Sequence, residues 1–162
     1  MISIEENRYF LQPGYIFVSR EPYLVHTVLG SCVSVCLWDS FNRFGGMNHY
    51  VYSESPDGER NGRFGNIAIP YLIQLMLESG AQMNNLKAHI IGGGQNPSLG
   101  SFIGTENAAT AEKLLKKSKI EILTRDVLGQ FGRKVIFNSQ SGEILIYKIN
   151  EIRRDDWYGK EN

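Results

Sequence analysis

The segments TVLGSCVSVCLWD (Thr27 to Asp39) and GGMNHYV (Gly45 to Val51) decide much of the fold, and together they predict a β-hairpin. In the first segment Val33, Val35 and Leu37 alternate with Ser, Cys and Trp, which is the two-residue period of a strand. The run between the segments is polar and contains glycine, as turns do. The two segments are therefore expected to pair as neighbouring antiparallel strands.

The expected pairing brings a cysteine close to a histidine. A turn centred between Ser40 and Phe41 would place Cys32 directly opposite His49, because opposed residues in an antiparallel pair have numbers with a constant sum. With a loop two residues longer, His49 becomes a diagonal neighbour of Cys32 on the same face. A slip by an odd number of residues would separate the two side chains onto opposite faces.

A cysteine beside a histidine is a pattern typical of thiol catalysis. An imidazolium lowers the pKa of a neighbouring thiol and stabilises the nucleophilic thiolate. Gly30 and Ser31 leave the backbone before Cys32 free of bulk, so its N–H groups are candidates to bind an oxyanion. The alternative is structural, with Cys32 a small buried apolar residue and His49 a satisfied strand residue.

Motifs along most of the chain resemble the signature of the CheD family, the chemoreceptor glutamine deamidases of bacterial and archaeal chemotaxis. The first are Leu29 to Leu37 and Gly46 to His49, around the cysteine and the histidine. Others follow in the order and spacing of that family: Ile91 to Gly94, Ile103-Gly104 with Asn107, Asp126 with Gly129, Gly132 to Val135, and Ser141 to Glu143. The resemblance spans Pro13 to Ile149 and is more specific than a lone Cys/His pair.

This resemblance implies a protein-glutamine deamidase that converts specific glutamines of methyl-accepting chemotaxis receptors to glutamate and releases ammonia. Cys32 would attack the side-chain amide and form a thioester, and His49 would transfer the protons. The third catalytic residue of the family is a threonine shortly before the Gly-Ser-Cys, and Thr27 is the only threonine before Cys32. Some members hold that threonine one residue earlier, where this chain has His26, itself an alternative general base.

The resemblance also implies partners. Chemoreceptors would be the substrate, and CheD proteins also pair with the CheC phosphatase. The alternative function is therefore a non-catalytic regulatory module that docks on receptors and on CheC. We expect no cofactor and no metal ion.

Composition favours a cytoplasmic globular protein. The chain has 162 residues, the size of one domain, and we expect a single CheD-like domain over 1–162 with a polar tail from about Asn150. Lys plus Arg and Asp plus Glu number 17 each, so no broad positive field exists to bind nucleic acid. We find no signal peptide and no stretch of about 18 apolar residues, and direct membrane insertion is not expected.

The two cysteines are expected to be free thiols. Cys32 and Cys36 lie four residues apart on one predicted strand, or about 13 Å at 3.3 Å per residue. That distance is too large for a disulfide, and it makes a metal site built from both cysteines and His49 a weak alternative. Free thiols suit a reducing cytosol.

The remaining pattern predicts an α+β fold. Apolar residues at helical spacing predict helices over 67–79, with Pro70 in the first turn, and over 106–117, capped by Thr105. Aromatic and β-branched runs predict further strands over 15–19, 23–27, 86–91, 120–127, 135–137 and 144–147. Two helices against so many strands predict a β-sandwich core with both helices on one face. The resemblance implies the same three-layer α/β/β sandwich, similar to bacterial toxin deamidases.

Two further segments are glycine-rich or polar. Gly92 to Gly94 lack a Walker A or dinucleotide pattern, so they predict close backbone approach at a strand end, beside the Cys32 site, rather than a nucleotide site. Ser53 to Arg63 is predicted to be a solvated surface loop, with one wall of the site as the alternative.

Overall fold

The computed structural model describes residues 7–95 and 102–150, and within these the chain forms strands, two α-helices and a short 3-10 helix. In chain order they are β1 (Arg8–Phe10), β2 (Ile16–Ser19), β3 (Leu24–Leu29), β4 (Val33–Asp39), β5 (Phe44–Asn48), α1 (Gly65–Glu78), η2 (Met83–Asn85), β6 (Leu86–Gly92), α2 (Ile103–Lys117), β7 (Glu121–Val127), β8 (Gly132–Asn138) and β9 (Ile144–Ile149). The tail predicted after Asn150 lies outside the described residues.

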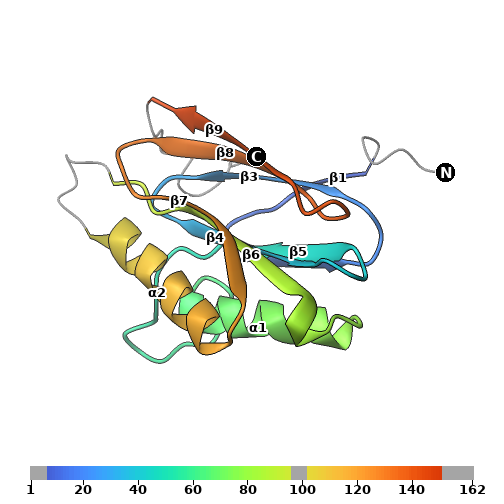
Figure 1. Ribbon diagram of the computed structural model, residues 1–162. Coiled ribbons are helices and arrows are strands. Elements are labelled where there is room, and N and C mark those ends of the chain that lie inside the picture. The colour runs from blue at the N-terminus through green and yellow to red at the C-terminus, as the bar shows by residue number, and fades with distance from the viewer. Residues whose placement is uncertain (1–6, 96–101, 151–162) are drawn as a thin grey trace.

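The strands form two mixed sheets that stack face to face. One sheet has four strands in the order β1-β3-β8-β9, and the other has five in the order β2-β5-β4-β6-β7. The pairs β1–β3 and β6–β7 are parallel, and the remaining pairs are antiparallel. Figure 1 shows α1 and α2 on the outer face of the five-stranded sheet. This three-layer arrangement confirms the predicted α+β sandwich, with both helices on one side.

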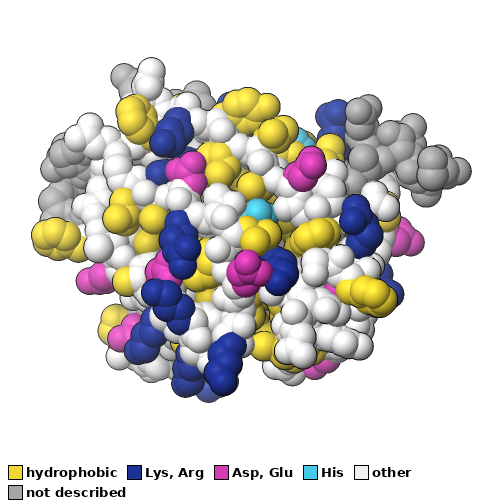
Figure 2. Space-filling model, viewed as in Figure 1, with side chains coloured by type: hydrophobic (Ala, Val, Ile, Leu, Met, Phe, Trp, Pro, Cys, Tyr) yellow, Lys and Arg dark blue, Asp and Glu magenta, His cyan; other side chains and the backbone are white. Residues whose placement is uncertain are grey.

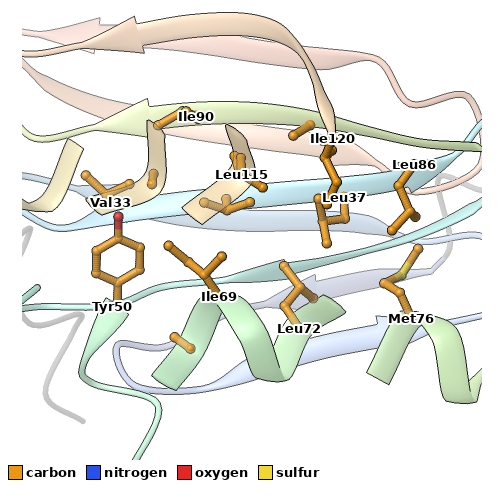
Figure 3. Packing of buried hydrophobic residues seen from close by; sticks show 14 of the residues in the cluster. Val33, Leu37, Tyr50, Ile69, Leu72, Met76, Leu86, Ile90, Leu115 and Ile120 are labelled. Atoms are coloured by element: carbon orange, nitrogen blue, oxygen red, sulfur yellow. The ribbon is translucent and has the colours of Figure 1, made fainter. Parts of the chain in front are cut away.

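The five-stranded sheet is covered on both faces, and its central strand β4 is correspondingly apolar. Towards the helices, Val33 and Leu37 pack with Ile69, Leu72 and Met76 of α1 (Figure 3). Towards the four-stranded sheet a second cluster fills the space between the sheets: Leu11, Val25, Leu29, Cys32, Cys36, Met47, Val51, Ile91, Val135 and Phe137. Successive side chains of a strand point to opposite faces, so Cys32 lies on the inter-sheet side.

Both helices begin earlier than the sequence predicts. α1 starts at Gly65, which puts Pro70 in the second turn rather than the first. α2 starts at Ile103 with Phe102 as its N-cap and no side-chain cap bond, so the predicted cap at Thr105 is wrong. The reason is tertiary: Gly104 packs against the backbone of Gly93, and this contact fixes the first turn of α2.

Arg133 links β8 of the four-stranded sheet to β7 of the five-stranded sheet. It is almost fully buried on β8, and its Nε lies 3.0 Å from Oδ1 of Asp126 on β7. Its Nη2 donates to the carbonyl of Leu128 at 2.7 Å, and its Nη1 donates to Phe131 at 3.1 Å. Because a buried guanidinium needs such partners, these contacts hold the β7–β8 connection in one conformation.

Charge is mixed over the surface. Figure 2 shows Lys and Arg side chains gathered over α2 and neighbouring β7, with acidic side chains among them. Lys116 and Lys117 lie in the last turn of α2, as predicted, where they favour the negative end of the helix dipole. Among the residues described, no helix is long and apolar enough to cross a membrane.

Candidate active site

The hairpin of β4 and β5 forms, but its register is the longer-loop alternative. Cys36 opposes Met47, and Val33 opposes Tyr50 with backbone N–H···O distances of 3.1 and 3.0 Å. The prediction that Cys32 lies directly opposite His49 is therefore wrong, and the two are diagonal neighbours on the inter-sheet face. Diagonal residues of this kind typically have Cα atoms about 7–8 Å apart.

Asp39 explains the shift of the turn. Its carboxylate accepts the backbone N–H groups of Phe41 and Asn42 at 2.9 and 2.7 Å, and its carbonyl accepts that of Arg43 at 2.8 Å. Arg43 has a φ of 59°, so the chain closes through a left-handed residue. The turn is thereby centred one residue later than the alternation of β4 alone suggests.

A hydrogen bond between the two sheets orients the His49 ring. Oγ1 of Thr27 on β3 lies 2.7 Å from Nδ1 of His49 and donates its own proton to the carbonyl of Leu11 at 2.9 Å. The hydroxyl oxygen must then accept a hydrogen bond from Nδ1–H. In the neutral imidazole the proton is therefore on Nδ1, and Nε2 is unprotonated. Nε2 is buried and has no hydrogen-bond partner among the described residues.

His26 points the other way. Burial alternates along β3, with Val25, Thr27 and Leu29 facing the core and His26 on the outer face of the four-stranded sheet. Its ring stacks on Phe10 at 4.8 Å between centroids. The structure therefore brings Thr27, and not His26, to His49.

Cys32 and His49 are both almost fully buried, each with 1% of its surface exposed. Burial raises the pKa of the Cys32 thiol to about 12, against lowering effects of its own backbone N–H and of Arg63. Burial also lowers the pKa of His49 to about 3. Both groups are therefore neutral at pH 7 in this closed arrangement, whereas the sequence pattern predicts an ion pair.

The three carbonyls around the cysteine are all held by hydrogen bonds. The carbonyls of Gly30 and Cys32 each accept a backbone N–H at 2.9 Å, from Gly94 and Gly93 respectively, and that of Ser31 accepts a side-chain amide at 3.0 Å. A Cβ at Gly92 would lie 2.2 Å from the Cys32 carbonyl oxygen, so this approach requires glycine. The predicted close backbone approach beside Cys32 is confirmed.

The sequence comparisons assign the family. The model of the family described as "CheD chemotactic sensory transduction" matches residues 51–148, more than half of the chain. The chain belongs to the CheD family. The matched segment begins after Cys32 and His49.

Several curated CheD proteins align with most of this chain. "Probable chemoreceptor glutamine deamidase CheD 1" of Anaeromyxobacter dehalogenans is 41% identical over 145 residues, which cover 86% of this chain and 84% of the relative. "Probable chemoreceptor glutamine deamidase CheD" of Sulfurimonas denitrificans is 35% identical and covers 91% and 98%. The protein of the same name from Borreliella burgdorferi is 40% identical and covers 83% and 84%.

The structure gives a physical reason for two of the motifs that resemble CheD, one of which, at Asn107, had no predicted role. The side chain that bonds Ser31 belongs to Asn107 of α2, and it also donates to the Val51 carbonyl at 2.8 Å. The available signal was a polar residue on the side of α2 that Ala111 and Leu115 bury. The glycine motif at 92–94 is explained by the backbone hydrogen bonds that Gly93 and Gly94 donate to residues 30–32, the cysteine loop.

Arg63 is a second residue that sequence reasoning did not single out. Its carbonyl accepts the backbone N–H groups of Val51 and Tyr52 at 2.8 and 3.1 Å, so the end of the 53–63 loop adjoins the strand that follows His49. Its positive charge lowers the pKa of Cys32. Most of this loop is exposed, as predicted for a solvated loop.

The second cysteine lies apart from this arrangement. Cys36 is buried on β4 and lies opposite His89 of β6 in the strand register, and neither cysteine forms a disulfide. Within residues 7–95 and 102–150, no three His, Cys, Asp or Glu side chains are grouped to hold a metal ion. The structure gives no support to a site built from Cys32, Cys36 and His49.

Proposed function

We propose that this protein is a cytoplasmic deamidase that converts glutamines of methyl-accepting chemoreceptors to glutamate, with Cys32 as nucleophile, His49 as general base and acid, and Thr27 as the residue that orients His49. The observation that carries the proposal is the Thr27–His49 hydrogen bond, which leaves Nε2 as a buried acceptor on the face that Cys32 shares. The names of the CheD relatives support the substrate class.

In the first half-reaction Sγ of Cys32 attacks the carboxamide carbon of a glutamine. The thiol proton moves to Nε2 of His49, which then gives it to the departing nitrogen as the C–N bond breaks. Ammonia leaves and a thioester joins the substrate to Cys32. The backbone N–H of Cys32 is the candidate donor to the oxyanion.

In the second half-reaction water replaces ammonia. His49 Nε2 takes a proton from the water as its oxygen attacks the thioester carbon, and it returns the proton to sulfur as the C–S bond breaks. The products are glutamate and the free thiol. The sum is one water consumed and one ammonia released for each glutamine.

The burial of both groups supports proton transfer during attack rather than a standing ion pair. The pKa of Cys32 is raised to about 12 and that of His49 is lowered to about 3 in the closed state. A substrate amide that enters would bring polar groups to the sulfur and assist its ionisation. The thiol is therefore almost entirely protonated before a glutamine is bound.

The test is incubation of the purified protein with the cytoplasmic fragment of a chemoreceptor, followed by peptide mass spectrometry and an ammonia assay. We expect a mass increase of about one unit at single glutamines, abolished by Cys32→Ala. Cys36→Ala is the matched control, because Cys36 is the other buried free thiol, and it should retain the activity. Deamidation that persists in Cys32→Ala would refute the assignment.

The closed site also favours a second candidate function. With only 1% of Cys32 and of His49 exposed, the protein can act by occupancy alone, docking on receptors and on a CheC phosphatase. Chemotaxis of a deletion strain complemented with Cys32→Ala separates the two functions. Complete rescue would favour docking, and failure of rescue by a stably expressed variant would favour catalysis.

A further inference from the structure

Asn107 is the buried polar side chain nearest in the hydrogen-bond network to the cysteine loop. It is fully buried on α2, and its Nδ2 donates to two carbonyls at once, Ser31 at 3.0 Å and Val51 at 2.8 Å. Both partners are carbonyl oxygens, so the nitrogen of the amide must face them. Asn107 therefore joins α2 to both chain segments of the hairpin, just beyond the Val33–Tyr50 pair.

The backbone of the same residue is also fixed. Its carbonyl accepts the hydroxyl of Tyr50 at 2.5 Å, and Tyr50 is the residue directly after His49. The three hydrogen bonds of Asn107 thus reach the residue before Cys32, the residue after His49 and the next one along.

The amide has one unsatisfied atom. Oδ1 of Asn107 is buried without a hydrogen-bond partner in the described part of the chain. An unpaired buried acceptor destabilises a fold, and the two hydrogen bonds that Nδ2 donates to buried carbonyls offset this cost. The position therefore requires the amide donor, Nδ2.

The Ser31 bond is linked directly to the nucleophile. A peptide unit sets the C=O of one residue opposite to the N–H of the next, so the Ser31 carbonyl and the Cys32 N–H belong to one rigid group. The Cys32 N–H belongs to the same residue as the sulfur, and it lowers the pKa of that thiol. A donor on the carbonyl polarises the unit and strengthens the N–H as a donor at its other end.

We propose that Asn107 is the positioning residue of the Cys32 nucleophile: its side-chain amide fixes the Ser31–Cys32 peptide, and with it the backbone of the residue that carries the sulfur. Asn107 lies on the helix side of the sheet and acts through this peptide, without touching the substrate. The inference rests on the proposed function for its catalytic consequence, but its effect on the thiol is independent of any substrate.

The experiment compares iodoacetamide alkylation of Cys32 and Cys36, resolved by peptide mass spectrometry over a range of pH, in the wild type and in Asn107→Ala. We expect alkylation of Cys32 to fall about tenfold at neutral pH, with its pH profile moved up by about one unit, because the thiolate loses a polarised donor. Alkylation of Cys36 should not change, and kcat for deamidation should fall while KM stays within about twofold.

Two controls, the alkylation of Cys36 and the variant Leu115→Ala, distinguish a positioning role of Asn107 from a general loss of structure. Leu115 is buried on the same helix and has no contact with the cysteine loop among the hydrogen bonds described. Loosening of the core raises the alkylation of both thiols, as Leu115→Ala should do. Equal alkylation of Cys32 in Asn107→Ala and wild type, or a parallel rise at Cys32 and Cys36, would overturn the proposal.

Asn107→Gln keeps the test usable if the alanine variant does not fold. It retains the amide donor on a longer side chain, and we expect a smaller fall in Cys32 alkylation with native reactivity at Cys36. If Cys32 were alkylated at the wild-type rate in Asn107→Gln, where the amide is displaced, a positioning role would be contradicted. If the wild type shows no deamidation, the proposed function fails, while the alkylation results still decide the role of Asn107.

Discussion

At the scale of single residues, the hydroxyl of Thr27 is predicted to set the reactivity of His49. Thr27→Val preserves the shape of the side chain but removes the acceptor for Nδ1, which lies 2.7 Å away. A hydrogen bond to a group that becomes charged during the reaction contributes about 1.5–3 kcal/mol, so we expect kcat to fall about ten- to a hundredfold. Steady-state deamidation of a receptor fragment measures this effect.

Two variants control for this result. Thr27→Ser keeps the hydroxyl and should retain most of the activity. His26→Gln alters a side chain on the outer face of the same strand, and its activity should stay within about twofold of wild type. If His26→Gln lost activity while Thr27→Val kept it, the assignment of the orienting residue would be reversed.

The sequence predicted those features of the candidate site that depend only on residue type and on the two-residue period of a strand. The strand period of the first segment predicted that Cys32 and His49 share a face in two of the three registers considered, and the glycines at 92–94 predicted close backbone approach. The choice between Thr27 and His26 was not predictable, because it depends on which face of β3 meets the other sheet. The contacts of Asn107 also depend on packing between a helix and two distant segments.

At the scale of elements, the start of α2 depends on a glycine contact. Ala normally stabilises a helix interior relative to Gly by about 1 kcal/mol. A Cβ at Gly104, however, would lie 2.3 Å from the Gly93 carbonyl oxygen and 2.7 Å from that of Gly94, and backbone atoms must move to admit it. We expect Gly104→Ala to destabilise the protein by about 1–3 kcal/mol and to lower deamidase activity, since Gly93 and Gly94 hold the cysteine loop.

Urea unfolding and an activity assay measure the two effects. Glu106→Ala, an exposed change in the same turn, should alter the free energy of unfolding by less than about 1 kcal/mol. Stabilisation by Gly104→Ala, as helix propensity alone predicts, would show that the glycine contact is not required.

Elements were predicted well where their apolar period is long, and less well at their ends. The helix over 67–79, the strands over 86–91 and 120–127 and the hairpin of 135–137 with 144–147 all correspond to observed elements. β1 was not predicted, because its residues are exposed and polar in part. The helix starts were displaced because a glycine contact and a loop, rather than local caps, fix them.

At the scale of the whole molecule, stability is expected to depend on pH through the buried histidines and thiols. Burial lowers the pKa of His49 to about 3, and the pKa values of His26 and His89 are also lowered. Between the folded pKa and the unfolded value of 6.5 the unfolded chain binds more protons, so stability falls as pH drops below about 6.5. His49 alone accounts for a slope of up to about 1.4 kcal/mol per pH unit.

The opposite sign holds at high pH. Burial raises the pKa of Cys32 to about 12 and that of Cys36 well above its usual value of 9.0, so the unfolded chain releases protons first and stability falls above about pH 9. Urea unfolding should therefore give a stability plateau between about pH 6.5 and pH 9. In His49→Gln the slope of the unfolding free energy against pH below that plateau should decrease by the equivalent of about one bound proton. An unchanged slope would contradict the burial of a neutral His49.

The sequence by itself determined the α+β class, the layer of helices on one face and the family resemblance. These follow from hydrophobic period, helix spacing and motif order, which are local properties of the chain. Only the tertiary structure decided that His49 is a diagonal neighbour of Cys32, that Thr27 rather than His26 meets its ring, and that Asn107 joins the two segments. Register and facing between sheets are set by turn geometry and by the packing of layers, which residues distant in the sequence fix together.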